Sequence, residues 1–259
     1  MNLNLIGKRA LVCGSTAGIG WASAIELALL GAEVCLIARN EEKLKQRLTE
    51  LPAESGQNHH YLVADFSKTD EVRAALKTSK GDYHILVNNT GGPAGGQIID
   101  ESAEKFQKTF EQHLVVNQLL AQHVVPFMKT ERFGRIVNVI SVSVKQPIVG
   151  LGVSNTIRWA VASWAKTLSK ELSHTGITVN NILPGFTMTS RLEQVIKQRA
   201  DREGKSTGEI EKEILASIPS GKFADAEEVG AAVAYLCSPV AASVNGINLP
   251  VDGGLSASL

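Results

Sequence analysis

Three glycines, Gly14, Gly18 and Gly20, are spaced to let a phosphate approach the backbone closely. They follow an apolar run at residues 10–13, typical of a short buried strand, and they open a helix that continues to Gly31. Free N–H groups and the helix dipole attract an anion at such a point, so we expect a pyrophosphate there. The spacing is G-x-x-x-G-x-G rather than the general G-x-G-x-x-G, and an ordinary strand-to-helix turn remains the alternative. The candidate contacts are Gly14, Ser15, Thr16, Gly18, Ile19 and Gly20.

The second predicted strand, residues 33–38, ends at Arg39 and Asn40. A site for NAD places an acidic residue there, against the ribose 2′-hydroxyl, whereas a guanidinium suits a 2′-phosphate. The sequence therefore predicts NADP(H) in preference to NAD(H), with NAD(H) and a solvated loop arginine as alternatives. A charged helix is expected from residue 41 to about 51, ending before Pro52.

A third strand, residues 61–64, is followed by Asp65 and Phe66. Ligands of open α/β sheets bind at this end of a strand, so Asp65 is a candidate partner for the adenine amino group. It could equally cap the helix that is expected to begin near Ser67. His59 and His60 have no Cys, Asp or third His at ligand spacing, and we interpret them as surface residues rather than a metal site.

A fourth strand, residues 84–87, ends in paired asparagines and glycines. The amides of this pair, Asn88 and Asn89, can tie neighbouring strands together, and Asn89 is also a candidate cofactor contact. Gly91 would let the backbone approach a ribose.

With this motif the chain resembles a short-chain dehydrogenase/reductase, and the resemblance spans essentially the full chain. CGSTAGIG is similar to the family's TGxxxGIG, and NNTGG is similar to its NNAG. LVVNQ, GRIVNVIS, LPGFTMT and LPVDGG follow in the family's order. The resemblance implies an α/β fold: a Rossmann-like, doubly wound parallel sheet of seven strands in the order 3-2-1-4-5-6-7, with helices on both faces.

The resemblance assigns roles to two residues. A helix expected at about residues 103–128 carries Asn117, and its apolar side would include Phe106, Phe110, Leu114 and Leu120. In the family the matching asparagine distorts its helix and holds a water in a proton relay; a polar residue on a helix face is the alternative. The fifth strand, residues 136–140, leads to Ser141, where the family has the serine that hydrogen-bonds the substrate carbonyl.

The family's Tyr-x-x-x-Lys is replaced. Counting from Ser141 gives Ser154 and Arg158, on one face of a helix whose apolar pattern from Val153 to Leu172 fixes the register. An aliphatic alcohol is a far poorer proton donor than a phenol, and an arginine stays protonated where a lysine can relay protons. Lys145 is a candidate replacement acid or an anchor for an anionic substrate, with a solvated loop lysine as the alternative.

The sixth strand, residues 177–183, leads to residues that the family uses against the nicotinamide carboxamide and pyrophosphate: Pro184, Gly185, Thr187 and Thr189. The charged segment that follows carries scattered apolar positions, typical of one or two mobile helices. We expect a substrate lid at about residues 187–222. A last helix at 226–237 and a strand at 247–251 close the fold.

Composition limits what the chain can be. At 259 residues with 44% hydrophobic residues and no linker or repeat, a single domain over residues 1–259 is expected. Lys+Arg and Asp+Glu number 26 each, so no nucleic-acid or membrane partner is indicated. Three cysteines inside apolar runs predict buried thiols and a cytoplasmic setting, and no metal site is expected.

Two functions are compatible with these residues. The first is an NADP(H)-dependent oxidoreductase, 3-oxoacyl reductase-like, acting on a ketone or secondary alcohol. The second is a dinucleotide-binding pseudoenzyme that serves as a sensor or oligomer partner. The resemblance also implies a homotetramer or homodimer, with Trp159 and Trp164 on different faces of the helix after residue 152.

Overall fold

The computed structural model describes residues 1–258; Leu259, the last residue of the predicted domain, lies outside them. A seven-stranded parallel sheet with the order β3-β2-β1-β4-β5-β6-β7 forms the centre of the described chain. The predicted fold class and strand order are therefore confirmed. The strands are β1 Arg9–Cys13, β2 Glu33–Ala38, β3 His60–Val63, β4 Ile85–Asn88, β5 Gly134–Val139, β6 Ile177–Pro184 and β7 Asn248–Val251.

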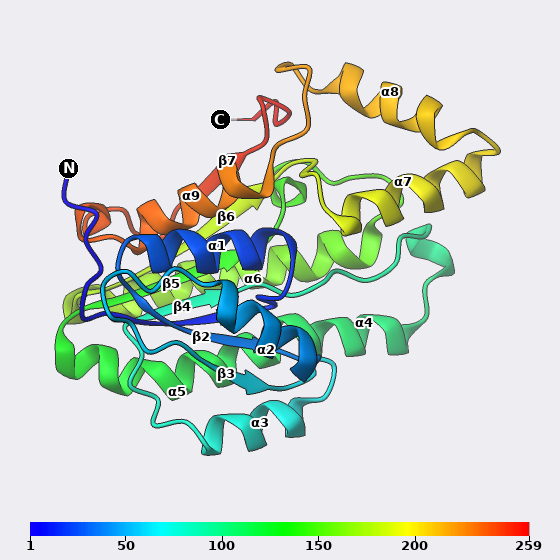
Figure 1. Ribbon diagram of the computed structural model, residues 1–259. Coiled ribbons are helices and arrows are strands. Elements are labelled where there is room, and N and C mark those ends of the chain that lie inside the picture. Colours follow the sequence, from blue (N-terminus) through cyan, green and yellow to red (C-terminus); the bar gives the residue numbers. More distant parts are fainter. Residues whose placement is uncertain (259) are drawn as a thin grey trace.

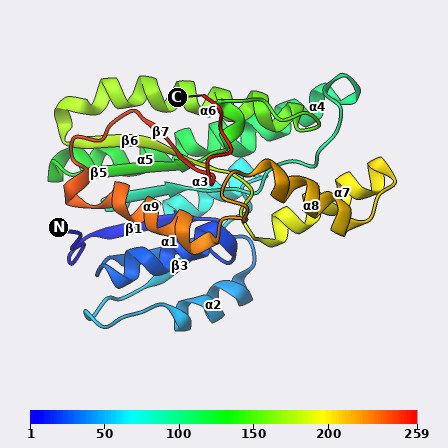
Figure 2. The same cartoon turned by 90° about the horizontal axis from the view of Figure 1, so that it is seen from above.

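Helices cover both faces of the sheet (Figures 1 and 2). Apolar side chains of α1, α2 and α9 share one core with one face of the sheet, and those of α3, α5 and α6 share another with the opposite face. The five inner strands, β2, β1, β4, β5 and β6, are buried on both sides, which explains their continuous apolar runs in the sequence, whereas the edge strands β3 and β7 are partly exposed. The helices are α1 Gly18–Leu29, α2 Glu41–Glu50, α3 Thr69–Lys77, α4 Ala103–Phe110, α5 Val116–Glu131, α6 Gly152–Leu172, α7 Ser190–Glu203, α8 Thr207–Ser217 and α9 Ala226–Cys237.

The helix predicted at residues 103–128 is interrupted. A π-helical turn, Glu111–Val115, separates α4 from α5, and α5 continues to Glu131. Phe110, expected on the apolar side, is 40% exposed instead. The 3.6-residue pattern alone could not reveal this, because a π turn adds a residue and shifts the faces of the two helices relative to each other.

The segment expected to form a lid contains two helices, α7 and α8, which project from one end of the sheet (Figure 1). They pack against each other around a small apolar cluster of their own, which includes Leu192, Ile196, Ile210 and Ile214. The first turn of α7 points back toward the ends of the strands. This segment therefore covers the edge at which the predicted site residues gather.

One smaller prediction is wrong, and one alternative for Asp65 is excluded. His59 and His60 are half-buried rather than on the surface: His59 Nδ1 accepts the Val34 N–H at 3.0 Å, and His60 Nε2 lies 3.1 Å from the Tyr83 hydroxyl. Asp65 does not cap α3, because that helix begins only at Thr69. The three cysteines are free and buried, as expected.

Candidate functional site

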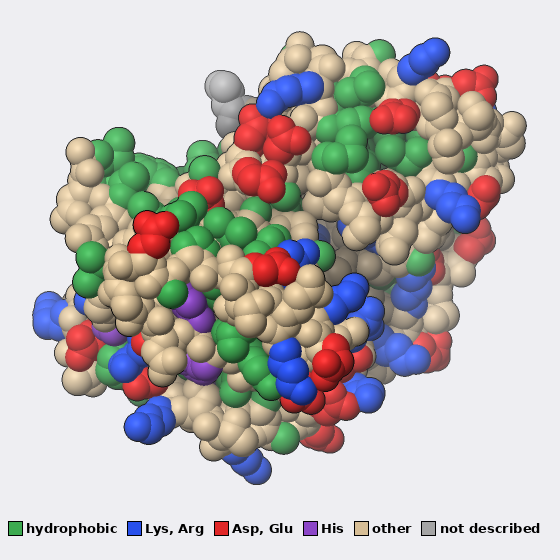
Figure 3. All heavy atoms as spheres, viewed as in Figure 1, with side chains coloured by type: hydrophobic (Ala, Val, Ile, Leu, Met, Phe, Trp, Pro, Cys, Tyr) green, Lys and Arg blue, Asp and Glu red, His purple; other side chains and the backbone are tan. Residues whose placement is uncertain are grey.

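A cavity of about 330 Å³ opens at the carboxyl ends of β1, β4, β5 and β6, beneath α7. Figure 3 shows the corresponding recess between the body of the molecule and the lobe formed by α7 and α8. Many of the predicted site residues line this cavity: Gly14, Gly18, Ile19, Asn89, Gly91, Ser141, Ser154, Arg158, Pro184, Gly185, Thr187 and Thr189. One cavity therefore joins the glycine turn to the candidate catalytic serines.

The glycine turn is packed so closely that side chains are excluded. A Cβ at Gly20 would lie 2.3 Å from the Gly14 carbonyl oxygen, and a Cβ at Gly14 would lie 2.6 Å from that of Asn89. Gly14 also has φ +59°, which an L side chain rarely adopts. Without side chains, the N-terminus of α1 is exposed to whatever occupies the cavity.

The polar groups of this turn fit a phosphate. Ser15 Oγ is buried and has no hydrogen-bond partner among residues 1–258. The N-cap residue of α1 is Ala17, which provides no side-chain cap for the helix N–H groups. Ser15 does not line the cavity, but an anion at the helix N-terminus would satisfy the N–H groups that Ala17 leaves without a side-chain cap. The turn therefore fits the pyrophosphate of a dinucleotide.

Arg39 and Asn40 lie where β2 ends, at the outer part of the predicted cofactor site. Arg39 is exposed, which leaves its guanidinium accessible to a ligand phosphate. Asn40 caps α2 by accepting the Lys43 N–H at 2.9 Å. Asp65 accepts hydrogen bonds from Ser67; although partial burial opposes its ionisation, these bonds and the charge of Arg39 keep the pKa of Asp65 below its usual value.

Asparagine side chains join the strands below the cavity, as predicted for the pair at the end of β4, but the sequence did not reveal that the ladder extends to β7. Asn88 Nδ2 donates to Asn138 Oδ1 at 2.8 Å, Asn138 Nδ2 donates to Asn181 Oδ1 at 2.9 Å, and Asn181 Nδ2 donates to Asn248 Oδ1 at 2.8 Å. The four residues are paired in register across β4, β5, β6 and β7. Asn89 Nδ2 donates to the carbonyl oxygens of Cys13 and Gly14, and so ties β4 to the glycine turn.

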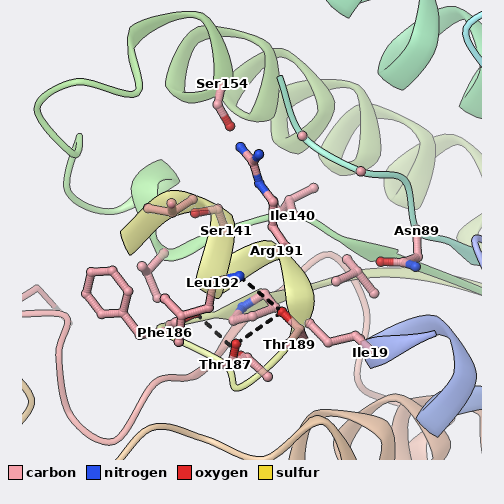
Figure 4. Close-up of a pocket in the computed structure, with 18 of the residues that line it drawn as sticks. Ile19, Asn89, Ile140, Ser141, Ser154, Phe186, Thr187, Thr189, Arg191 and Leu192 are labelled. Atoms are coloured by element: carbon pink, nitrogen blue, oxygen red, sulfur yellow. Dashed lines mark hydrogen bonds between the residues drawn. The ribbon is translucent and has the colours of Figure 1, made fainter. Parts of the chain in front are cut away.

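Ser141 follows β5 and faces the cavity (Figure 4). Its Oγ accepts the N–H of Ser143 at 3.1 Å. Because this bond uses an acceptor position, the Ser141 hydroxyl hydrogen remains available to donate to a substrate oxygen. Ser154, in the first turn of α6, lies on the opposite wall and is half-buried.

Arg158 lies one helical turn after Ser154 and is buried. Its Nη1 donates to the Val139 carbonyl at 2.7 Å and its Nη2 to the Thr90 carbonyl at 3.3 Å, so it links the ends of β5 and β4. Burial, together with the charge of Arg191, lowers the pKa of Arg158 to about 10. The guanidinium is still charged at neutral pH.

Several predicted site residues do not line the cavity. They are Ser15, Thr16, Gly20, Arg39, Asn40, Asp65, Phe66, Asn117 and Lys145. Asn117 is buried in α5, immediately after the π turn. On that turn, His113 Nδ1 lies 2.6 Å from the Thr90 hydroxyl; burial and the charge of Arg158 hold the pKa of His113 well below its usual range.

Arg191 is a cavity residue that the sequence reasoning missed. It is the second residue of α7, after the N-cap Thr189, whose side chain accepts the Leu192 N–H. Its Nη2 donates to the Pro93 carbonyl, and burial lowers its pKa. A signal was present in the sequence: a cation in the first turn of a helix opposes the helix dipole and needs a compensating partner.

Residues 1–258 contain neither a cluster of metal ligands nor a membrane-spanning helix. No group of three or more His, Cys, Asp or Glu side chains there is arranged to hold a metal ion. In the same range, every helix is too short or too polar to span a bilayer.

Comparisons with known proteins agree with this architecture. A family profile described as enoyl-(acyl carrier protein) reductase matches residues 14–256. The 3-oxoacyl-(acyl-carrier-protein) reductase of Haemophilus influenzae is 32% identical over 249 residues, covering 96% of this chain and 98% of that protein.

Two solved structures are similar over nearly the whole chain. A variant of the actinorhodin polyketide ketoreductase, solved with NADPH, has a TM-score of 0.89 and 33% identity, covering 96% of this chain and 97% of its own. The L-sorbose reductase of Gluconobacter frateurii, complexed with NADPH and L-sorbose, has a TM-score of 0.92 and 29% identity, and both chains are covered in full.

Proposed function

The chain belongs to the short-chain dehydrogenase/reductase family, and from that premise we propose that it uses NADP(H) to interconvert a ketone and a secondary alcohol. It is an oxidoreductase of the ketoacyl reductase-like kind. One observation carries the proposal: the glycine turn and both candidate catalytic serines line the same cavity. A cofactor bound at the turn and a carbonyl bound at the serines would be in contact there.

The cofactor would extend from the glycine turn along the ends of the strands. When bound, NADPH supplies the hydride, and NADP⁺ accepts one in the reverse direction. We assign the pyrophosphate to the turn at residues 14–20, the 2′-phosphate to Arg39 beside Asn40, and the adenine to Asp65 and Phe66. Preference for NADP(H) rests on the exposed guanidinium of Arg39. Ribose and nicotinamide contacts are assigned to Asn89, Gly91, Arg158, Pro184, Gly185, Thr187 and Thr189.

Ser154 and Arg158 are proposed to occupy the positions of the family's tyrosine and lysine. Two observations support this: Ser154 follows Ser141 by thirteen residues, and both side chains lie on one face of α6 at the cavity wall. Ser141 and Ser154 would donate hydrogen bonds to the carbonyl oxygen. The buried charge of Arg158, next to Ser154, would stabilise the negative charge that develops on that oxygen, and solvent would then supply the proton.

The missing phenol slows such a site without abolishing it. A general acid typically contributes 10²- to 10⁴-fold, which is about 3 to 5 kcal/mol of barrier. Holding hydride donor and carbonyl in contact can contribute about 7 to 11 kcal/mol. Asn117 and Lys145 are further candidates for delivering the proton, directly or through water. We therefore expect turnover that is slow but real.

Three further assignments are proposals of the same kind. The segment at residues 187–222, with α7 and α8, would open and close over the substrate. The chain would assemble as a homotetramer or homodimer through α4, α5 and α6, where Trp159 is 50% exposed. Light scattering at micromolar concentration checks the assembly, and a monomer would contradict it. A cytoplasmic location remains a prediction from the cysteines.

The function is tested by NADPH oxidation against ketones, diketones and 3-oxoacyl thioesters. Wild type should show slow turnover, and Ser141→Ala should lower kcat with at least one ketone. The double variant Ser154→Tyr with Arg158→Lys provides the comparison. If only the double variant turns over, and wild type does not exceed buffer, the oxidoreductase proposal fails in favour of a binding protein.

A further inference from the structure

The cavity carries an uncompensated positive charge. Among the described residues that line it there is no Asp, Glu, Lys or His, and the ionisable side chains are Arg158 and Arg191. No carboxylate in residues 1–258 forms an ion pair with either arginine. Buried charges are normally paired, so two arginines facing one cavity indicate a missing anion.

The two guanidinium groups also disfavour each other. Each keeps a backbone carbonyl as partner: Arg158 those of Val139 and Thr90, and Arg191 that of Pro93. Carbonyl dipoles satisfy N–H groups without neutralising charge. The charge of Arg191 is a cause of the lowered pKa of Arg158, which shows how closely the two cations interact. An anion bound in the cavity next to both guanidinium groups would relieve this repulsion.

The helix that carries Arg191 adds to the same field. Arg191 lies in the first turn of the fourteen-residue helix α7, whose N-terminus is the positive end of its dipole. The acidic residue of this turn, Glu193, is exposed and does not line the cavity, so no carboxylate faces Arg191 there. Dipole and side chain therefore both favour an anion on the cavity side of α7.

The guanidinium of Arg191 lies away from the expected pyrophosphate position, so the anion that it binds is a different one. At the phosphate end of the cavity, Gly18 lies against Thr189, with 3.1 Å between a Cβ at Gly18 and Thr189 Cγ2. Arg191 points away from that end, toward Ser154 (Figure 4). A Cβ at Gly92 would lie 3.7 Å from Arg191 Nη2 and 4.0 Å from Ser154 Oγ. Arg191 therefore lies at the carbonyl end.

We propose that the substrate is an oxo acid whose carboxylate binds Arg191 while its ketone binds Ser141 and Ser154. This rests on the proposed function and adds the substrate class to it. Arg191 Nη2 and Ser154 Oγ both lie within 4.0 Å of the position of a Cβ at Gly92, so a carboxylate near the ketone fits best, and we take 2-oxo and 3-oxo acids as the candidates. The rest of the molecule would be apolar, because the outer wall consists of Ile148, Leu151, Phe186, Leu192, Val195 and Leu255.

The test compares an acid with its neutral ester. We would measure kcat/KM with NADPH for 2-oxohexanoate and 3-oxohexanoate, each against its methyl ester. The wild type should prefer at least one acid, and Arg191→Leu should lower the acid-to-ester ratio by about 10- to 100-fold, the size of a charge-assisted contact. Arg191→Lys should recover part of that ratio. Lys197→Met is the matched control: it removes a cation from the exposed side of α7 and should leave the ratio unchanged.

Three outcomes overturn the proposal. They are a wild type that prefers both esters, a ratio that is the same in wild type and Arg191→Leu, and an Arg191→Leu variant whose NADPH affinity falls as much as its acid activity. The last result would assign the arginine to a cofactor phosphate.

Binding separates this proposal from the proposed function. If no ketone is turned over, calorimetry with hexanoate and NADP⁺-loaded protein still decides. Hexanoate that binds wild type and Lys197→Met at least tenfold more tightly than Arg191→Leu supports the anion site although the oxidoreductase proposal has failed. Equal binding to all three contradicts it. Thermal unfolding checks that Arg191→Leu is folded, and removal of a half-buried cation that has no carboxylate partner should change its Tm little.

Discussion

Replacing Gly20 with alanine should remove NADPH binding while leaving the fold in place. The new Cβ would lie 2.3 Å from the Gly14 carbonyl oxygen and 2.6 Å from Asn89 Nδ2. Ordinary contact requires roughly 3.4 Å, so α1 must move away from the turn by roughly 1 Å. Hydrogen bonds from the turn to a phosphate lengthen by a similar amount and are largely lost.

The expected loss of affinity follows from the number of those bonds. Each charge-assisted hydrogen bond contributes about 1.5 to 3 kcal/mol, so losing two raises the Kd for NADPH by roughly 100-fold or more. Fluorescence titration of NADPH measures this. Gly208→Ala is the matched control, because a Cβ at Gly208 has no neighbour within 4 Å. It should bind NADPH as wild type does.

Circular dichroism and thermal unfolding must show that the variant is folded. Gly18→Ala provides a graded second variant, since its Cβ would meet only the Thr189 side chain, at 3.1 Å. Its φ of +54° costs on the order of 1 kcal/mol, and the Kd should rise less than in Gly20→Ala. A folded Gly20→Ala that binds NADPH within about threefold of wild type would refute the assignment of the turn.

Three other results are expected. Titrations should show that wild type binds NADPH about tenfold more tightly than NADH, a modest factor because Arg39 is exposed and its contact with the 2′-phosphate is screened by solvent. Arg39→Asp should reverse this preference. Equal affinities of wild type for the two cofactors would contradict the assignment of the 2′-phosphate to Arg39. Asn138→Leu leaves two buried amide partners unpaired, at about 1 to 3 kcal/mol each, and should lower Tm by roughly 5 to 15 °C; an unchanged Tm would show that the ladder is not needed for stability. Burial lowers the pKa of His84 to about 4 in the folded protein. As the pH decreases, this histidine is therefore protonated in the unfolded chain before it is protonated in the folded one, so the free energy of unfolding should fall between about pH 6.5 and pH 4. His84→Asn keeps an acceptor for the Arg9 N–H but cannot be protonated, and its Tm should vary less over that range; a profile parallel to wild type would contradict this.

The fold could be predicted from the sequence because its signals are local. β1, β4 and β5 are apolar runs that lead to Gly14, Asn89 and Ser141, and these three residues line the cavity. Counting along one helix was enough to set Ser154 and Arg158 one turn apart. Within residues 1–258 the order of the strands then places the glycine turn and the catalytic serines at the same edge of the sheet.

What the sequence could not reveal depends on contacts between distant segments. The asparagine ladder requires the register of four strands, which no single run of residues determines. His59 is half-buried, and its ring contacts Val34 on a neighbouring strand and the Pro52 carbonyl. Arg191 faces the cavity because α7 begins beside the ends of the strands, and its orientation relative to Ser154 is a tertiary property. The missing anion could be inferred only once that orientation was known.

The central claim is that this cavity transfers hydride to a carbonyl although it contains no tyrosine. The most direct measurement uses NADPH deuterated at C4, incubated with wild type and the ketone and oxo-acid panel, with the products analysed by mass spectrometry. Deuterium on the new carbinol carbon with wild type, and none with a folded Gly20→Ala, is the predicted result. Unlabelled or absent alcohol from every substrate, in protein that demonstrably binds NADPH, would contradict the claim.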